Sequence, residues 1–312
     1  FQWFSVINVT WCYHEIEQFA FLVTDKMQFE SKEPAHGTFA RFGVLSFNGN
    51  KMITTSGGGA LICNGKSFPS GEDLGGASTS EEDANEVMWY ATQAPDTYPY
   101  YEHTAIGYNY RMSNVCAGIG RGQMTVLEAH IAHHKHVQEL YKELLKDVRG
   151  VTLHEQPADP RYDSNFWLCA ATLEPSVRIV GQESAYKEVI TSAVGGAAGV
   201  IKAVESATTD CQPNDNVEAL RVFMLDKKVE CRPLWKPMHK QPVYVNGGVA
   251  AVSVECLADG IIRQTSDNSV AYINGVSEEI FKVGFCLPAG PYVTDDDVRY
   301  IVACIKEAVV NV

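Results

Sequence analysis

The sequence lacks several features that would place it in particular classes of protein. Its nine cysteines stand apart with no CxxC pair, which argues against a disulfide framework or a zinc site in a chain of 312 residues. No uninterrupted apolar run approaches the roughly 20 residues that a membrane span needs. The first residues, Phe1 to Phe4, show no basic leader and no signal-peptide cleavage pattern. We therefore expect a reduced, cytoplasmic protein with buried thiols and no membrane partner.

Positive charge is also scarce. The chain has 25 Lys and Arg against 38 Asp and Glu, a formal net charge of -13. A surface that binds nucleic acid needs basic residues to meet the phosphates, so this balance argues against a nucleic-acid partner. The remaining composition, 46% hydrophobic and 20% charged, is that of a globular protein long enough for two domains.

Short apolar runs alternate with helical patterns along the chain, which predicts an α/β fold. The patterns predict strands at 21–24, 44–47, 60–63, 151–154, 166–172 and 229–233, and helices at 82–92, 117–146, 186–194 and 295–309. The helix over 117–146 is long enough to join two domains, and the pattern changes to shorter elements after Gly150.

The most informative segment runs from Phe42 to Gly59. A predicted strand ends in Ser46, Lys51 follows five residues later, and three consecutive glycines begin at Gly57. A lysine becomes a nucleophile when burial or neighbouring positive charge lowers its pKa, and it can then form a Schiff base with an aldehyde cofactor. From the spacing alone, a turn that carries an exposed lysine is the favoured interpretation.

The amino-acid sequence of this segment resembles the lysine motif of the DegT/DnrJ/StrS family, the nucleotide-sugar aminotransferases that use pyridoxal 5'-phosphate (PLP). Three further blocks resemble the same family in the same order: GYNYRMSN at 107–114, RPLWKPMH at 232–239 and CLPAG at 286–290. Together the blocks span residues 37 to 312. The sequences of these blocks are most similar to those of the branch that acts on UDP-linked 4-keto-6-deoxy-N-acetylhexosamines.

The resemblance implies an aminotransferase of fold type I, with a mixed, mostly parallel sheet covered by helices on both faces and a smaller C-terminal α+β domain. Residues 1–125 would form part of the large PLP-binding domain, and 126–312 the linking helix and the small domain. The enzyme would move an amino group from glutamate to the keto carbon of a nucleotide-linked sugar, for bacterial surface glycans or polysaccharides. It would work as a homodimer with shared active sites.

The resemblance also assigns roles to individual residues. Lys51 would bind PLP covalently and then carry the proton between the substrate carbon and the cofactor. Ser46 would hydrogen-bond the cofactor phosphate, and Asn109 would reach the phosphate in the neighbouring subunit. Asp25 would face the pyridine nitrogen and keep it protonated, so that the ring accepts electrons. Gln28 would contact the hydroxyl side of the ring.

Three more residues are candidates for contact with the substrate. Arg111 is suited to an anionic group, either the diphosphate or the donor's carboxylate, and equally to an ion pair between subunits. Trp235 and His239 stand in the RPLWKPMH block, which borders the active site in the family, but they could equally be core and turn residues.

A histidine cluster offers a different chemistry. His130, His133 and His134 fall on one face of the predicted helix, where they could hold a metal, with His136 close by. No acid or cysteine nearby in the sequence completes such a site. A solvated helix face is therefore favoured, and no metal is expected.

The sequence also departs from the family. Known members are longer, and the shortfall lies ahead of Asp25, where they carry the Gly-Thr turn that holds the phosphate and the ring that stacks on the cofactor. Two stretches look inserted, at about 183–212 and 247–270. We expect the chain to be the last two-thirds of such an enzyme. The alternative is a truncated or degenerate relative that dimerises or binds a sugar nucleotide without turnover.

Overall fold

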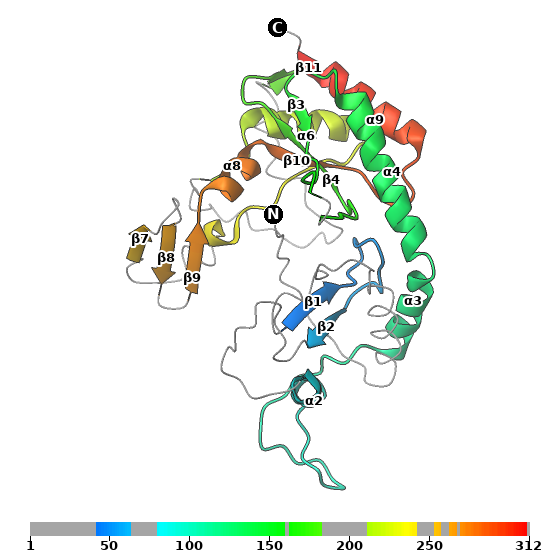
Figure 1. Cartoon of the computed structure of the whole chain (residues 1–312), viewed down its shortest axis with the longest axis vertical. Helices are drawn as coiled ribbons and strands as arrows, with labels where there is room; N and C mark the ends of the chain where they lie inside the picture. Colours follow the sequence, from blue (N-terminus) through cyan, green and yellow to red (C-terminus); the bar gives the residue numbers. More distant parts are fainter. Residues whose placement is uncertain are drawn as a thin grey trace. The chain divides into compact units, whose positions relative to one another are not determined.

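The computed structural model describes residues 42–63, 80–159, 162–182, 211–241, 253–256, 262–266 and 269–310 (Figure 1). The chain divides into two compact units, one ending at Ala132 and the other beginning at His133. The division lies inside helix α4 (Leu127–Leu145). The sequence places its boundary at residue 125, and the assignment of a PLP-binding and a small domain stays a prediction.

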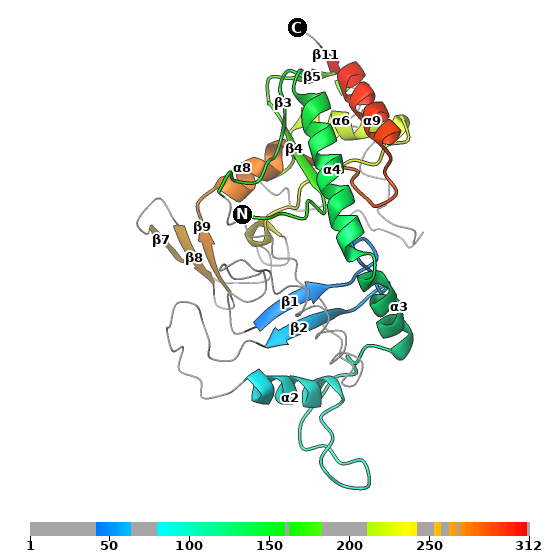
Figure 2. The same cartoon turned by 45° about the vertical axis from the view of Figure 1, so that its right-hand side comes forward.

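Within the residues that the structure describes, the first unit contains an antiparallel strand pair. Strand β1 (Phe42–Ser46) pairs with β2 (Gly59–Cys63), with Ser46 opposite Gly59. Helix α2 (Ser80–Ala91) contacts β2, and helix α3 (Asn114–Met124) follows after a long connection (Figure 2). A small core gathers side chains from these elements and from the segments next to them, namely Phe47, Ala60, Met88, Ala91, Met112, Ala117 and Met124.

The predicted helix over 117–146 is interrupted. Helix α3 ends at Met124, and α4 begins at Leu127. The Thr125 amide donates to the Gly122 carbonyl at 3.1 Å, and the Thr125 hydroxyl donates to the same carbonyl at 2.7 Å. The Gly122 carbonyl thus bonds to the third residue after it, in place of the fourth as in a regular helix, and the glycines of α3 weaken the helix further. Hydrophobic spacing alone does not reveal this break.

The second unit contains a four-stranded antiparallel sheet in the order β3-β4-β10-β6. Its strands are β3 (Val151–Leu153), β4 (Cys169–Leu173), β10 (Gly284–Leu287) and β6 (Arg232–Pro233). Strand β10 is buried along its whole length, which fits a central position in the sheet. The 229–233 run predicted a strand that begins three residues earlier than β6, whose pairing with β10 covers only Arg232 and Pro233.

In the described ranges helices pack with this sheet and supply half of the buried residues of its core. They are α4, α6 (Asp215–Asp226), α8 (Val276–Val283) and α9 (Asp295–Ala308). Fully buried side chains include Tyr141 and Val137 of α4, Leu220 and Met224 of α6, and Val298 and Ile305 of α9. Thr294 and Asp297 form a reciprocal capping box that begins α9 close to its predicted start.

Shorter elements complete the second unit. Strand β5 (Arg178–Ile179) pairs with β11 (Val309–Val310), and a 3-10 turn, η2, covers Met238–Lys240. Strands β7 (Ser253–Cys256), β8 (Ile262–Ser266) and β9 (Ser269–Ile273) form a separate antiparallel sheet. This sheet falls largely in the stretch that the sequence marks as inserted at 247–270.

Several sequence predictions lie outside the residues that the structure describes. They include the strand at 21–24, the helix at 186–194 and almost all of the 183–212 insertion. All strand pairs within the described part of the chain are antiparallel. None of the helices within these ranges is long and apolar enough to cross a membrane.

The buried thiols of the second unit generate a prediction about reactivity. Burial raises the pKa of Cys169, Cys231 and Cys286 to about 12, with smaller contributions from neighbouring thiols at the first two. Because the thiolate is the reactive form, these cysteines should be alkylated roughly a thousandfold more slowly at pH 8 than an ordinary thiol. Peptide mapping of iodoacetamide-treated native protein measures this.

The half-buried Cys63 and Cys116 of the first unit serve as the internal control for that mapping. We expect them to react first in native protein, and all of these cysteines to react at similar rates in urea. Labelling of Cys286 as fast as Cys116 without denaturant would contradict the core described above.

Candidate active site

Lys51 lies in the loop that connects β1 to β2, which we call the Lys51 loop (residues 47–58). The Asn48-Gly49-Asn50 sequence turns the chain sharply after the strand, and the Lys51 amide donates to the Asn48 carbonyl at 3.0 Å. The Asn48 amide donates to Ser46 Oγ at 3.4 Å. Ser46 and Lys51 therefore come from the same end of β1, as their spacing in the sequence indicates.

One buried residue closes this loop at both ends. The Phe47 amide donates to the Gly58 carbonyl at 3.0 Å, and the Phe47 carbonyl accepts from the Thr55 amide at 2.9 Å. The Thr54 hydroxyl donates to that same carbonyl at 3.2 Å. The Phe47 ring is only 3% exposed and packs in the core of the first unit. The loop is thus anchored to the core through its first residue.

The glycines after Lys51 allow a close approach between two segments. Gly58 has φ of +94°, and a Cβ built there would lie 2.8 Å from Cε of Met112. Ser56 also has a positive φ of 72°, and its amide donates to Thr54 Oγ1 at 2.9 Å. A side chain at Gly58 would therefore meet backbone strain, and the flexible end of Met112 would have to shift. Met112 joins the GYNYRMSN block to the Lys51 loop at this point.

The Lys51 side chain is half-buried, and this partial burial lowers the pKa of its ammonium group. A lower pKa leaves a larger fraction of neutral amine at a given pH, and the neutral amine is the nucleophile. Ser46 Oγ accepts from Asn48, which leaves its own hydrogen able to donate to a ligand.

PLP, the cofactor that the sequence resemblance implies, carries an aldehyde and a phosphate. The end of β1 offers a partly desolvated amine at Lys51 and a hydroxyl donor at Ser46, which are the two groups that such a molecule requires. The donor set therefore fits the cofactor. Asp25 and Gln28 lie outside the described residues, and their contacts with the ring stay predictions.

Asn109 and Arg111 lie in an extended segment beside the C-terminal end of α2. The Tyr108 amide donates to the Tyr90 carbonyl at 2.7 Å, and the Tyr110 amide donates to the Ala91 carbonyl at 3.0 Å. Gly107 is needed here, since a Cβ would lie 2.3 Å from the Gln93 carbonyl carbon. The side chains of Asn109 and Arg111 are exposed to solvent. The contact between this block and the Lys51 loop is made by Met112.

Trp235 and His239 belong to the second unit. Trp235 is 50% exposed, and its ring centroid lies 6.0 Å from that of Trp167. His239 Nε2 lies 2.6 Å from the carboxylate of Glu278, which Lys240 approaches at 3.5 Å. Partial burial pushes the pKa of Glu278 upward, but the hydrogen bond from His239 and the charge of Lys240 outweigh it, so the pKa is lowered. The contact between Nε2 and the Glu278 carboxylate therefore holds the His239 ring in place.

The histidines of α4 do not form a metal site. No group of three potential metal-binding side chains exists in the described ranges. His134 is 1% exposed, and its Nδ1 contacts the Phe166 carbonyl at 3.1 Å, so the expectation of a solvated face was wrong for this residue. His136 Nε2 contacts Asp295 at 2.7 Å. His130 instead reaches the Lys51 loop.

Two residues near Lys51 were not predicted from the sequence. Gln123 Oε1 accepts from the Thr54 amide at 3.2 Å, and His130 Nδ1 lies 3.0 Å from the Met52 carbonyl. Both come from α3 and α4, far along the chain from the loop. These contacts join segments that lie far apart in the chain. A single sequence contains no pattern that links such segments, so it could not reveal the two residues.

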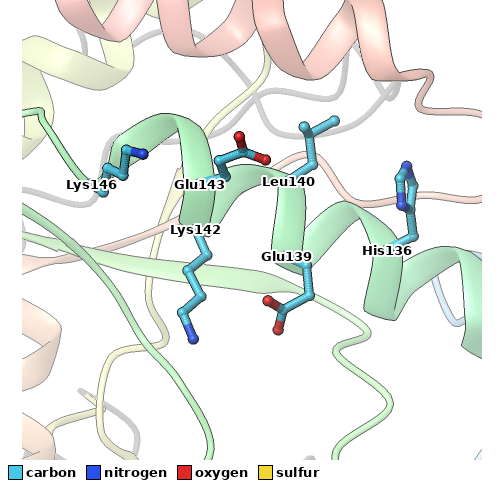
Figure 3. A pocket seen from close by; sticks show the side chains of 6 residues that line it. All are labelled: His136, Glu139, Leu140, Lys142, Glu143 and Lys146. Atoms are coloured by element: carbon cyan, nitrogen blue, oxygen red, sulfur yellow. The ribbon is translucent and has the colours of Figure 1, made fainter.

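A shallow groove of about 440 Å³ runs along α4 in the second unit (Figure 3). Its lining side chains all come from this helix, namely His136, Glu139, Leu140, Lys142, Glu143 and Lys146. Their charges alternate in sign, and His136 and Lys142 are paired with Asp295 and Glu155. The groove contains none of the predicted site residues and offers no evident chemistry.

Comparison with known protein families agrees with the sequence blocks. The model of the "DegT/DnrJ/EryC1/StrS aminotransferase family" matches residues 28–194. The chain is 30% identical over 261 residues to the "Putative pyridoxal phosphate-dependent aminotransferase EpsN" of Bacillus subtilis, a match that covers 84% of this chain and 48% of that protein. It is 22% identical to the "GDP-perosamine synthase" of Escherichia coli O157:H7, over 87% of this chain and 52% of the relative.

Solved structures share the fold. The aminotransferase TlmJ of Streptoalloteichus hindustanus gives a TM-score of 0.56 at 19% identity, over 87% of this chain and 53% of that one. PseC of Helicobacter pylori, an aminotransferase of pseudoaminic acid biosynthesis, gives 0.55 at 14% identity, over 94% and 62%. The predicted aminotransferase fold of type I is confirmed. The chain spans about half the length of the curated relatives it matches.

The contact between Gly58 and Met112 generates a prediction about stability. We expect Gly58→Ala to lower the free energy of unfolding by about 1–3 kcal/mol, because a non-glycine residue at this φ is strained and its Cβ meets Met112. Urea unfolding followed by circular dichroism measures the change.

Gly57→Ala is the matched control for that measurement. No atom lies within 4 Å of a Cβ at this position, and its φ is not positive, so the free energy should change by only about 0.5 kcal/mol. Equal effects of the two substitutions would show that the Lys51 loop does not have this conformation.

Proposed function

The chain belongs to the DegT/DnrJ/EryC1/StrS aminotransferase family, and from this premise we propose that it transfers an amino group to the keto carbon of a nucleotide-linked sugar. PLP is the cofactor of this family. The observation that carries the proposal is the partly buried Lys51 amine, with its lowered pKa, on a loop anchored at both ends to Phe47. An exposed lysine in a mobile turn would have neither property.

Lys51 would hold the cofactor, and Ser46 would donate a hydrogen bond to its phosphate. When bound, PLP supplies a ring that stabilises negative charge at the substrate carbon next to the nitrogen. Once the substrate's amino group had displaced it from the cofactor, the freed Lys51 amine would take the proton from that carbon, for which it must be neutral. The fall in its pKa on burial increases the fraction of this neutral form at a given pH. Asp25 is proposed to keep the pyridine nitrogen protonated, and Gln28 to contact the ring hydroxyl.

Asn109 supports the proposal of a homodimer with shared sites. It is exposed, and it stands in the connection between α2 and α3 (Figure 1). The same connection exposes large apolar side chains. Tyr101 is 90% exposed, Ile106 is 86% exposed and Tyr108 is 50% exposed. Apolar side chains gathered in this way are typical of a surface that another chain covers. A second copy would bring Asn109 to the phosphate of its neighbour.

The substrate is proposed to be a 4-keto-6-deoxy sugar linked to a nucleotide, with glutamate as the amino donor and surface glycans or polysaccharides as the destination of the product. Arg111 is suited to an anionic group, and the exposed Trp235 and the fixed His239 to the sugar nucleotide. The sequence blocks favour UDP as the nucleotide. Relatives named GDP-perosamine synthase make GDP the alternative to test.

The first experiment adds PLP to the purified chain and follows the near-visible absorbance of a lysine Schiff base. We expect a band that borohydride removes, and a peptide map that places the reduced cofactor on Lys51. Lys51→Ala should show neither, and Lys51→Arg, which retains the charge, is the matched control for electrostatic attraction alone. Wild-type protein without trapped cofactor would contradict the proposal and favour a non-catalytic relative that binds sugar nucleotides.

The second experiment supplies glutamate and a panel of UDP-, GDP- and dTDP-linked 4-keto sugars to PLP-loaded protein. We expect amino sugar from the UDP-linked compound and none with Lys51→Ala, as measured by mass spectrometry of the products. Transfer to GDP-linked sugars alone would overturn the choice of nucleotide. Product formation by Lys51→Ala would overturn the role of the lysine.

A further inference from the structure

His130 stands in the first turn of α4, where it is half-buried. Its Nδ1 lies 3.0 Å from the backbone carbonyl of Met52, the residue directly after Lys51. A carbonyl oxygen only accepts hydrogen bonds, so Nδ1 must carry the hydrogen and donate it. Both the neutral ring in this tautomer and the charged ring can make the bond. His130 therefore holds the backbone of the Lys51 loop beside the reactive side chain.

A second side chain holds the same stretch from the preceding helix. Gln123 Oε1, close to the end of α3, accepts from the Thr54 amide at 3.2 Å. The peptide groups on both sides of Ile53 are thus bound from outside the loop, one through its carbonyl and the other through its N–H. The bonds to Phe47 fix the ends of the loop, and these two side chains fix the part that follows Lys51.

Two other histidines of α4 have different partners. His134 Nδ1 contacts the Phe166 carbonyl at 3.1 Å, and His136 Nε2 contacts Asp295 at 2.7 Å, both within the second unit. The contact made by His130 is therefore not a general property of the histidine-rich helix. It comes from the position of this residue in the first turn, directly after the break at Thr125 that separates α4 from α3.

We propose that His130 is a positioning residue for Lys51, which holds the Met52 carbonyl so that the lysine side chain stays in its partly buried place. This inference rests on the proposed function in taking Lys51 as the residue that binds the cofactor. His130 itself touches neither substrate nor cofactor in this account. Its removal would let the peptide after Lys51 move and would bring more water to the amine.

The experiment compares substitutions that keep or misplace the donor atom. His130→Asn retains an N–H donor close to the position of Nδ1, whereas His130→Gln places its donor one bond further out, near Nε2. His130→Ala removes the donor altogether. His136→Ala is the matched control, a histidine of the same helix whose partner is Asp295. Thermal unfolding by circular dichroism identifies any variant that does not fold.

The readout needs no cofactor. Competitive labelling with acetic anhydride across a pH series measures the pKa of the Lys51 amine in the apo chain. In wild type it should lie below the ordinary lysine value, as partial burial requires. With His130→Gln or His130→Ala we expect it to return toward that value, and each unit of rise lowers the neutral fraction of the amine about tenfold. His130→Asn and His136→Ala should label as wild type does.

Two results would overturn the inference. One is a Lys51 pKa in His130→Gln that equals the wild-type value, and the other is an equal rise of this pKa in His130→Asn and His130→Gln. The Asn and Gln pair decides the question even where His130→Ala does not fold. The proposed function fails in a different way. If wild type labels at a lowered pKa but borohydride traps no PLP on Lys51, the positioning stands and the cofactor role is wrong.

Discussion

The backbone of Phe47 is the constraint on which the rest of the candidate site depends. Its amide and carbonyl bind the Gly58 carbonyl and the Thr55 amide, while its ring is buried among the side chains of the first unit. The loop that carries Lys51 is therefore anchored to a packed core rather than left as a free turn. Partial burial of the lysine amine follows from this anchoring, and the lowered pKa follows from the burial.

The four sequence blocks become two packed assemblies in the structure. In the first unit, Gly58 at the end of the Lys51 loop lies against Met112 of the GYNYRMSN block. In the second unit, Arg232 and Pro233 of the RPLWKPMH block pair with Cys286 and Phe285 beside the LPAG turn. Each pair of blocks is thus joined by direct contact, either the close approach of a side chain to a glycine or a strand ladder. These contacts explain physically why each motif needs its small or extended residues.

Local patterns predicted the local elements well. The strands at 44–47 and 60–63 and the helices at 82–92 and 295–309 lie close to β1, β2, α2 and α9, because alternation, helical spacing and the Thr294 cap are all properties of neighbouring residues. The break at Thr125 was missed because a hydroxyl that takes a backbone carbonyl leaves no mark on hydrophobic spacing. The roles of Gln123 and His130 depend on contacts across 69 and 78 residues, which one sequence does not reveal. Ser46 and Lys51 could be placed together from spacing, whereas the contacts of Asp25 and Gln28 stay predictions.

The central claim is that the Lys51 loop, as folded on Phe47, presents an amine that binds PLP covalently. A crystal structure of the chain grown with PLP tests it most directly. The account predicts continuous electron density from Lys51 Nζ to the cofactor, with Ser46 Oγ at hydrogen-bond distance from the phosphate and the bonds of Phe47 to Gly58 and Thr55 retained. Cofactor bound elsewhere, or a Lys51 loop that follows a different path in a well-ordered first unit, would contradict it.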